Sequence, residues 1–229
     1  EPGYDLSLQA RSGIMSITGE EGRPPVKVGV AWIDVITGLH ATSAILAALL
    51  HRERTGKSQR IDISLWDCAI SALVNQAQNK IASGKEPRPM GSAHPNLVPY
   101  RAFEASDGWF VLAVGSDAQW QQMVEILEID CRESWSTNSG RVKDRIGVER
   151  TLFKIFKNDT RSHWENILEG IPCAPVNTIG QAICDIQSVA RGAVWSVEGV
   201  QTLANPLRGM SLTPAKPGQP SETSFDVNI

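Results

Sequence analysis

The feature that most constrains the fold is a long stretch of helical periodicity at residues 34–54. Apolar side chains recur there every three or four residues, which places them on one face of a helix. The row comprises Ile36, Leu39, Ser43, Leu46 and Leu50, and Ile45 and Leu49 widen it. Thr55-Gly56-Lys57 ends the helix, since glycine commonly follows the last helical turn. We expect the apolar row, and the run 43–50 in particular, to be buried.

The residues that follow this helix predict an α/β unit. Ile61, Ile63 and Leu65 alternate with polar residues, which is the pattern of a half-buried strand over residues 60–65. Helical periodicity then returns, and helix, turn, strand and helix at such short spacing favour an α/β arrangement. The remaining elements expected in this half are helices at 66–83 and 4–18, and either a buried strand or an extended loop at 26–32.

The second half of the chain predicts a smaller α+β domain at residues 100–185. A loop rich in Pro, Gly, Ser and Asn precedes it over residues 85–99. The elements expected are strands at 100–103 and 109–114 around the turn Ser106-Asp107-Gly108, helices at 118–129, 148–157 and 162–169, the last capped by Ser162, and a returning strand at 194–200. Beyond Leu207 the tail, rich in proline, is expected to be extended or disordered.

Composition and charge exclude several classes of function. The net charge is -3 and no basic run occurs, which excludes a nucleic-acid surface. No apolar stretch approaches the roughly 20 residues that span a bilayer, so we expect no membrane association.

The four cysteines and the start of the chain bear on its cellular context. Cys68, Cys131, Cys173 and Cys184 are scattered, so we expect reduced thiols and no metal site. Reduced thiols favour the cytosol or the mitochondrial matrix. The start at Glu1, without Met or a signal sequence, indicates a fragment, a processed product or a segment of a longer enzyme.

Asp34 stands at the start of the long helix and has two interpretations. It is either a helix N-cap, a common role for aspartate worth about 1 kcal/mol, or a carboxylate presented at a strand-to-helix turn. The second position suits a nucleophile in an α/β fold. Gly56-Lys57-Ser58 is not a phosphate loop, because His51 stands where that motif needs a glycine and the triplet ends a helix instead of opening one.

The segment Gly91-Ser92-Ala93-His94-Pro95 is a second candidate site within the long loop. Glycine and small neighbours permit close approach of the backbone to a ligand, whereas a plain connector between domains is the alternative. His94 is either a general acid or base or a residue whose hydrogen bonds fix the loop.

Several ordered segments together resemble the family III CoA-transferases, the CaiB/BaiF family. They are Gly3-Tyr4-Asp5 with Gln9-Ala10, Ser12-Gly13, Met15 and Thr18-Gly19; Val28-Gly29-Val30, Asp34 and Thr37-Gly38-Leu39; Ile45-Leu46-Ala47-Ala48-Leu49, Arg52, Thr55-Gly56-Lys57, Gln59 and Ile61-Asp62-Ile63-Ser64-Leu65; Gly91, His94-Pro95, Pro99-Tyr100, Phe103 and Asp107-Gly108; and Asn205-Pro206-Leu207 with Thr213-Pro214. The pattern is most similar to members that use dicarboxylic acids, such as the succinyl-CoA:glutarate transferases.

This resemblance implies a fold and a division of the chain. The fold is α/β, part of a Rossmann-like large domain plus a smaller α+β domain. Residues 1–99 are then the C-terminal part of the large CoA-binding domain with a linker, 100–185 the small domain, and 186–229 a return to the large domain and a tail. The family has roughly another half-chain before Gly3, which supplies most contacts to CoA, and its full-length members form intertwined homodimers.

The resemblance also implies roles for individual residues. Asp34 aligns with the catalytic aspartate, Tyr4 and Asp5 with positions that line the active site, and Gly91, Ser92 and His94 with the substrate-covering loop. The substrates implied are a coenzyme A thioester and a carboxylic acid, with no permanently bound cofactor and no metal.

Two alternative functions remain open at this stage. The α-methylacyl-CoA racemases, which this chain also resembles, carry Gly-His-Asp where it has Gly3-Tyr4-Asp5. A phenol with a pKa of about 10 is a poor substitute for that histidine in proton exchange. The other alternative is an inactive truncated paralogue that acts as a binding or scaffold protein.

Overall fold

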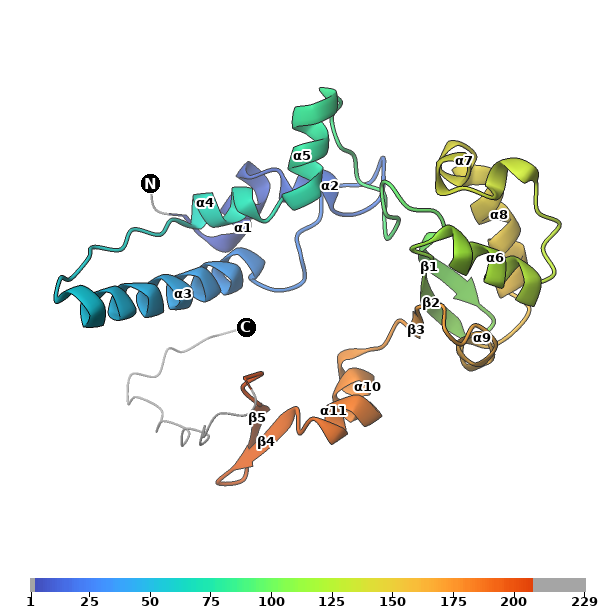
Figure 1. Cartoon of the computed structure of the whole chain (residues 1–229). Coiled ribbons are helices and arrows are strands. Elements are labelled where there is room, and N and C mark those ends of the chain that lie inside the picture. The colour runs from blue at the N-terminus through green and yellow to red at the C-terminus, as the bar shows by residue number, and fades with distance from the viewer. Residues whose placement is uncertain (1–2, 208–229) are drawn as a thin grey trace. The chain divides into compact units, whose positions relative to one another are not determined.

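A computed structural model describes residues 3–207 of the 229 residues. It divides into two compact units, Glu1–Ala174 and Pro175–Ile229, which are described separately. The helices of the first unit are α1 (Asp5–Arg11), α2 (Ile14–Ile17), α3 (Trp32–Thr55), α4 (Leu65–Ser71), α5 (Val74–Ser83), α6 (Asp117–Ile126), α7 (Asn138–Lys143), α8 (Arg145–Phe156) and α9 (Arg161–Ile167) (Figure 1). Its strands are β1 (Tyr100–Ala105) and β2 (Gly108–Ala113), with β3 (Cys173–Pro175) at the boundary and a 3-10 turn, η1, at Glu133–Trp135.

The long helix predicted from periodicity is α3, and it starts two residues earlier than expected. Gly56 ends it in the left-handed conformation, with φ of 70°, and donates its N–H to the Arg52 carbonyl at 2.8 Å. This confirms the predicted helix end. Glycine tolerates that φ without the steric cost that a Cβ imposes.

The predicted burial of α3 is wrong. Ile33 is its one buried residue among those described, whereas Leu39 is 64% exposed and Leu46 is 61% exposed. Periodicity shows which side chains share a face, but it does not show that a partner covers that face. By length and composition α3 also qualifies as a membrane span, with 6% of the tested window buried, so the statement that no apolar stretch is long enough was wrong.

The strand expected at residues 60–65 does not form within the described part of the chain. Helix α4 already begins at Leu65, where the Ser64 hydroxyl caps it by accepting the Asp67 N–H at 3.0 Å. Residues 58–64 are extended, but a β-strand needs a hydrogen-bonded neighbour and the described residues supply none.

Two of the predicted helices are each split in two. The region 4–18 is divided between α1 and α2 by Gly13, whose φ is 94°, and the region 66–83 is divided into α4 and α5 at Ala72 and Leu73. Residues 26–31 form a loop with bends at Gly29 and Val30, and Trp32 begins α3, so the loop alternative holds there and no strand forms.

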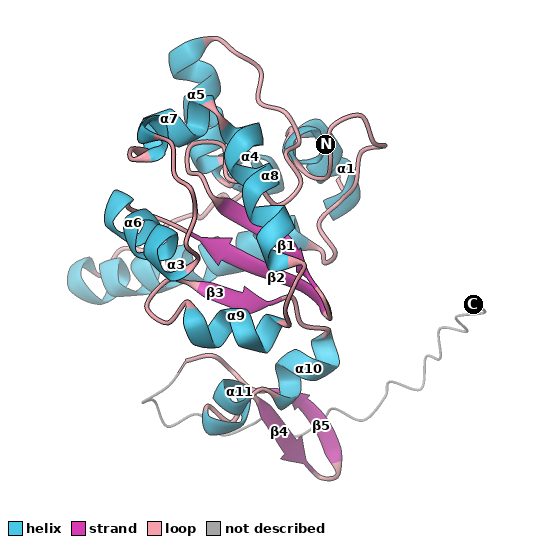
Figure 2. Ribbon diagram, turned by 90° about the vertical axis from the view of Figure 1, so that its right-hand side faces the viewer, coloured by secondary structure: helices cyan, strands magenta, loops and turns pink. Residues whose placement is uncertain are grey.

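The hairpin predicted around Ser106-Asp107-Gly108 is confirmed. Strands β1 and β2 pair antiparallel from Tyr100 opposite Ala113 to Ala105 opposite Gly108, and β3 extends the sheet in the order β1-β2-β3. Helix α9 starts one residue before the expected position, and its cap is Thr160, not Ser162, because the Thr160 hydroxyl accepts the His163 N–H. Helices α6, α8 and α9 surround the sheet in Figure 2.

The second unit contains two short helices and a hairpin. They are α10 (Ile179–Cys184), α11 (Ile186–Ala190), β4 (Val194–Val197) and β5 (Val200–Leu203). The single returning strand expected at residues 194–200 is therefore two antiparallel strands joined at Glu198 and Gly199, both of which have positive φ. The predicted tail beyond Leu207 lies outside the described residues.

Candidate functional site

The candidate site begins with Asp34 in the first turn of α3. The N-cap of this helix is Ala31, whose side chain cannot accept a hydrogen bond, so the interpretation of Asp34 as the N-cap is wrong. Asp34 is the third helical residue and its side chain is exposed. A carboxylate in the first turn is favoured by the positive end of the helix dipole, and here it also faces solvent, where a substrate can reach it.

The capping group of α3 comes from another helix. Asp5 in α1 accepts the backbone N–H of Ile33 at 2.7 Å and that of Asp34 at 3.4 Å through the same carboxylate oxygen, Oδ1. Its second oxygen accepts the Gln9 side-chain amide at 2.6 Å. Gln9 is fully buried, and its Oε1 accepts the Val28 N–H at 2.9 Å. Asp5 and Gln9 therefore fix the backbone that carries Asp34.

Three predicted site residues thus meet where α1 and α3 begin. Tyr4 is the N-cap residue of α1, 85% exposed, and directly precedes Asp5. The sequence assigned Asp5 to the site only through the family resemblance. Its hydrogen bonds to α3 span 28 and 29 residues, so no local capping pattern could have revealed them.

The other three predicted residues lie in the loop between α5 and β1. Gly91 has φ of 59° and donates its N–H to the Gly19 carbonyl at 2.7 Å. The Ser92 hydroxyl accepts the Ala102 N–H at 2.9 Å. His94 accepts the Asn96 N–H at its Nδ1, 3.1 Å away, and its ring centroid is 5.2 Å from that of Tyr100. These contacts agree with the interpretation in which the hydrogen bonds of His94 fix the loop.

Two arginines and a glutamate that sequence reasoning missed lie beside this loop, and one of them, Arg145, contacts it. Arg145 donates to the carbonyls of His94 at 2.8 Å and Pro95 at 3.1 Å. Glu149 is buried between Arg145 and Arg101 and forms ion pairs with both. A cavity of about 390 Å³ adjoins them, lined by Glu20, Glu21, Pro89, Met90, Gly91, Ala93, Arg101 and Arg145. Both guanidinium groups are paired with Glu149, so Arg101, Arg145 and Glu149 together carry one net positive charge, and the carboxylates of Glu20 and Glu21 also line the cavity.

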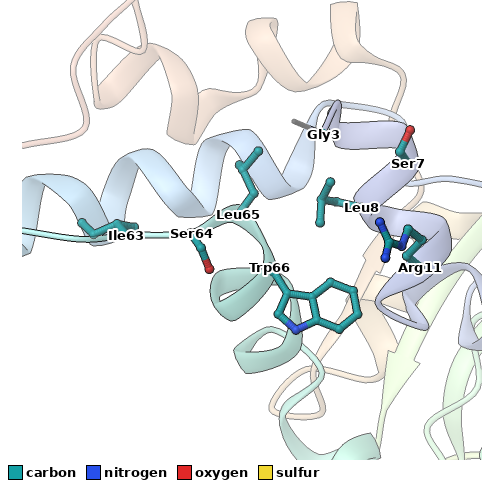
Figure 3. A pocket seen from close by; sticks show the side chains of 8 residues that line it. All are labelled: Gly3, Ser7, Leu8, Arg11, Ile63, Ser64, Leu65 and Trp66. Atoms are coloured by element: carbon teal, nitrogen blue, oxygen red, sulfur yellow. The ribbon is translucent and has the colours of Figure 1, made fainter. Parts of the chain in front are cut away.

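A larger cavity of about 550 Å³ lies between α1 and the start of α4 (Figure 3). It is lined by Gly3, Ser7, Leu8, Arg11, Ile63, Ser64, Leu65 and Trp66. The Arg11 guanidinium is 5.9 Å from the centre of the Trp66 ring, within the range of a cation–π contact. Because Gly3 and Leu8 flank the turn that carries Tyr4 and Asp5, this cavity opens next to the candidate site.

Metal and disulfide chemistry have no visible support in residues 3–207. No group of three or more potential metal-ligating side chains occurs there. All four cysteines lie within this range and are unpaired. Burial raises the pKa of the Cys173 thiol, with the nearby Glu165 carboxylate adding to the effect, so this cysteine is a weak nucleophile.

Comparison with known proteins assigns relatives over almost the whole chain. The family model described as CoA-transferase family III matches residues 1–222. A succinate–glutarate CoA-transferase of Agrobacterium fabrum is 37% identical over 96% of this chain and 57% of its own length. The human succinyl-CoA:glutarate CoA-transferase is 35% identical over 86% of this chain and 46% of its own length. The chain therefore spans about half the length of the curated relatives it matches.

A solved structure supports the same fold. A CaiB/BaiF family protein from Brucella suis superimposes with a TM-score of 0.77 and 42% identity, over 91% of this chain and 56% of that protein. This confirms the predicted fold class, including the mixture of helices with a small sheet. The names of the relatives also agree with the predicted similarity to transferases of dicarboxylic acids.

Proposed function

The chain belongs to CoA-transferase family III, and on this premise we propose that it carries the nucleophile of a CoA-transferase, Asp34. One observation supports this assignment above the others. The Asp34 carboxylate is exposed in the first turn of a helix whose end is held by Asp5 from another helix. A nucleophile on a fixed backbone keeps its orientation between successive steps, which favours catalysis.

The proposed reaction exchanges CoA between two carboxylic acids in four steps. The Asp34 carboxylate attacks the thioester carbonyl of the donor, and CoA leaves as a thiolate to give a mixed anhydride. The thiolate then attacks the aspartyl carbonyl, which releases the donor acid and leaves an aspartyl-CoA thioester. The acceptor carboxylate attacks this thioester, displacing the thiolate and forming a new anhydride. Finally the thiolate attacks the acceptor carbonyl, which gives the new acyl-CoA and restores the Asp34 carboxylate.

Water must be kept from these intermediates, because both the anhydride and the thioester hydrolyse. We assign this role to the loop that contains Gly91, Ser92 and His94. The amides of Gly91, Ala93 and His94 already donate to carbonyls of the protein. Within residues 3–207 the Ser92 amide has no such acceptor, so it is the amide of this loop available to an oxyanion.

The proposed acids are dicarboxylic, as in the relatives named for succinate and glutarate. A second carboxylate needs a cationic partner, and Arg101 and Arg145 offer one in the cavity beside Gly91. Tyr4 argues against the racemase alternative, because a phenol exchanges protons poorly near neutral pH. The intertwined homodimer and the cytosolic or mitochondrial location belong to the same proposal.

Replacing the proposed nucleophile tests the assignment in the protein at its full encoded length. We expect Asp34→Asn to lower the rate of CoA exchange by about 1,000-fold or more, since an amide cannot form the anhydride. Asp130→Asn removes another exposed carboxylate and is the matched control, expected to leave the rate unchanged. Exchange that survives in Asp34→Asn contradicts the proposal.

The alternative to an enzyme is an inactive paralogue that acts as a binding protein. Calorimetric titration with CoA separates the two. Binding of CoA by the protein at its full encoded length, followed by exchange, supports the enzyme, and binding without any exchange supports the paralogue.

A further inference from the structure

Arg145 connects the Gly91 loop to a buried carboxylate of α8. One of its nitrogens, Nη2, donates to the carbonyls of His94 at 2.8 Å and Pro95 at 3.1 Å. The other, Nη1, donates to Oε1 of Glu149 at 3.2 Å, one turn further along the helix. A guanidinium is rigid and planar, so fixing one of its edges fixes the direction of the other. The position of the Glu149 carboxylate therefore sets where Arg145 holds the loop.

Glu149 also joins α8 to β1. Its side chain is buried, and its second oxygen, Oε2, accepts a hydrogen bond from Nη1 of Arg101 in β1. A buried carboxylate with a cation on each oxygen has little freedom to move, because departure from either partner leaves a charge unpaired. Loss of its charge leaves the guanidinium groups of Arg101 and Arg145 to repel each other.

The loop is attached to β1 as well as to α8. The Tyr100 carbonyl accepts the His94 N–H at 2.9 Å, and the Ser92 hydroxyl accepts the Ala102 N–H at 2.9 Å. The loop is therefore bound by two elements, and Glu149 holds these two elements together through its ion pairs. A change at this one carboxylate reaches both attachments of the loop.

We propose that Glu149 is a positioning residue that acts through Arg145 to keep the Gly91 loop closed over the acylated Asp34. This inference rests on the proposed function, in which the loop excludes water. Glu149 does not occur among the described residues that line the cavity beside Gly91, so its effect passes through Arg145.

A loosened loop admits water to the activated intermediates. Water that attacks the carbonyl of the aspartyl-CoA thioester releases CoA as the thiol and restores the Asp34 carboxylate. Acyl-CoA is then consumed without formation of a new acyl-CoA. Hydrolysis that competes with transfer is therefore the property that Glu149 controls.

The test measures this competition in Glu149→Gln, in the protein at its full encoded length. With succinyl-CoA as donor and glutarate as acceptor, free thiol reports hydrolysis and glutaryl-CoA reports transfer. We expect the ratio of hydrolysis to transfer to rise about 10-fold or more. Glu125→Gln alters an exposed glutamate of α6 and is the matched control, expected to leave the ratio unchanged.

Arg145→Lys is a second variant, which keeps the positive charge beside the cavity. Lysine offers one ammonium group in place of the planar fork that joins the loop to Glu149, so we expect the same rise in the ratio. Arg150→Lys changes an exposed arginine of the same helix and is its control. Urea titration identifies variants that are folded under the assay conditions, and Arg145→Lys carries the test if Glu149→Gln does not fold.

Hydrogen exchange gives a readout that needs no catalysis. The amides of Ala93 and His94 donate to the carbonyls of Met90 and Tyr100. We expect both amides to exchange faster in Glu149→Gln, whereas the amides of β2 keep their rates.

Three results overturn the inference. They are an unchanged ratio of hydrolysis to transfer, unchanged exchange at the loop amides, and a rise confined to the KM for the acid, which indicates that Arg145 binds substrate and does not hold the loop. Failure of the proposed function is seen separately, because it leaves CoA exchange intact in Asp34→Asn. The loop amides test the inference in either case.

Discussion

Two hydrophobic clusters in the same unit differ sharply in how completely they are closed. The cluster built on β1, β2 and the helices α6 to α9 contains 16 buried residues, whereas the one around α1, α3 and α4 contains four among the residues described. The first includes Phe156, whose ring lies 5.0–5.2 Å from those of Phe110, Phe103 and Trp164. The second leaves most of a 24-residue helix exposed. Within residues 3–207 the first cluster is therefore closed, whereas the second leaves the apolar side chains of α3 exposed.

The largest expected effect disrupts the closed cluster at Arg141, the one cation that is fully buried among the described residues. Arg141 is 1% exposed and donates to the carbonyls of Val98 and Trp135 and to the Asp117 carboxylate. Arg141→Ala leaves these acceptors without their donor and is expected to cost about 3–5 kcal/mol of unfolding free energy, measured by urea titration. Arg88→Ala removes an exposed pair with Glu21 and should cost no more than about 1 kcal/mol. Equal losses in the two variants contradict the comparison.

A matched pair of leucines measures the contrast directly. Leu152 in α8 is fully buried and Leu46 in α3 is 61% exposed. Leu152→Ala is expected to lower the unfolding free energy by about 2–5 kcal/mol through the cavity it leaves, and Leu46→Ala to change it by less than about 0.5 kcal/mol. Urea titration of both variants checks this, and a loss in Leu46→Ala as large as that in Leu152→Ala contradicts the contrast between the two clusters.

The next effect concerns the end of α3. Asp5→Ala removes the acceptor of the Ile33 and Asp34 amides, and we expect a local loss of about 1–2 kcal/mol, the range of a helix cap. Faster hydrogen exchange at these two amides is the readout. Asp5→Asn keeps one oxygen acceptor, so its exchange rates should lie between those of the unmodified chain and of Asp5→Ala. Unchanged exchange in Asp5→Ala contradicts the capping role.

The smallest effect is a pH dependence in the hairpin of the closed cluster. The backbone N–H of Arg161 holds the pKa of the Asp107 carboxyl below its ordinary value of 3.8, and the Arg161 guanidinium adds to this. A lowered folded-state pKa stabilises the fold above pH 3.8 and loses that contribution as pH falls through the lower value. The difference in urea midpoint between the unmodified chain and Asp107→Asn should therefore shrink below about pH 4. A constant difference across this range contradicts the assignment.

The sequence predicted the closed cluster well because its signals are local. A turn at Ser106-Asp107-Gly108 and alternation on either side of it specify the hairpin, and Thr160 differs from the expected cap by only two residues. The open cluster was predicted less well, since Leu46 is 61% exposed and residues 60–64 pair with no strand in the described part of the chain. Periodicity shows which side chains share a face, but not whether another segment covers that face.

The candidate site also combines features with local sequence signals and contacts between distant segments that have none. The place of Asp34 at a helix start left two interpretations open, and the cap proved to be supplied by Asp5 across 28 residues. Arg145 was missed because it reaches the carbonyls of His94 and Pro95 from a helix some 50 residues further along the chain, and Glu149 because it acts only through its ion pairs with Arg145 and Arg101. Only the ordered family motifs, read together, linked Tyr4, Asp5 and Asp34 before the structure did.

Trapping the acylated side chain is the most direct test that Asp34 carries the activated group. The protein at its full encoded length is incubated with succinyl-CoA, quenched with hydroxylamine and digested, and its peptides are examined by mass spectrometry. We predict a hydroxamate on Asp34 that appears only when the acyl-CoA is present. A hydroxamate on another carboxylate, or none at all while CoA exchange proceeds, contradicts the assignment.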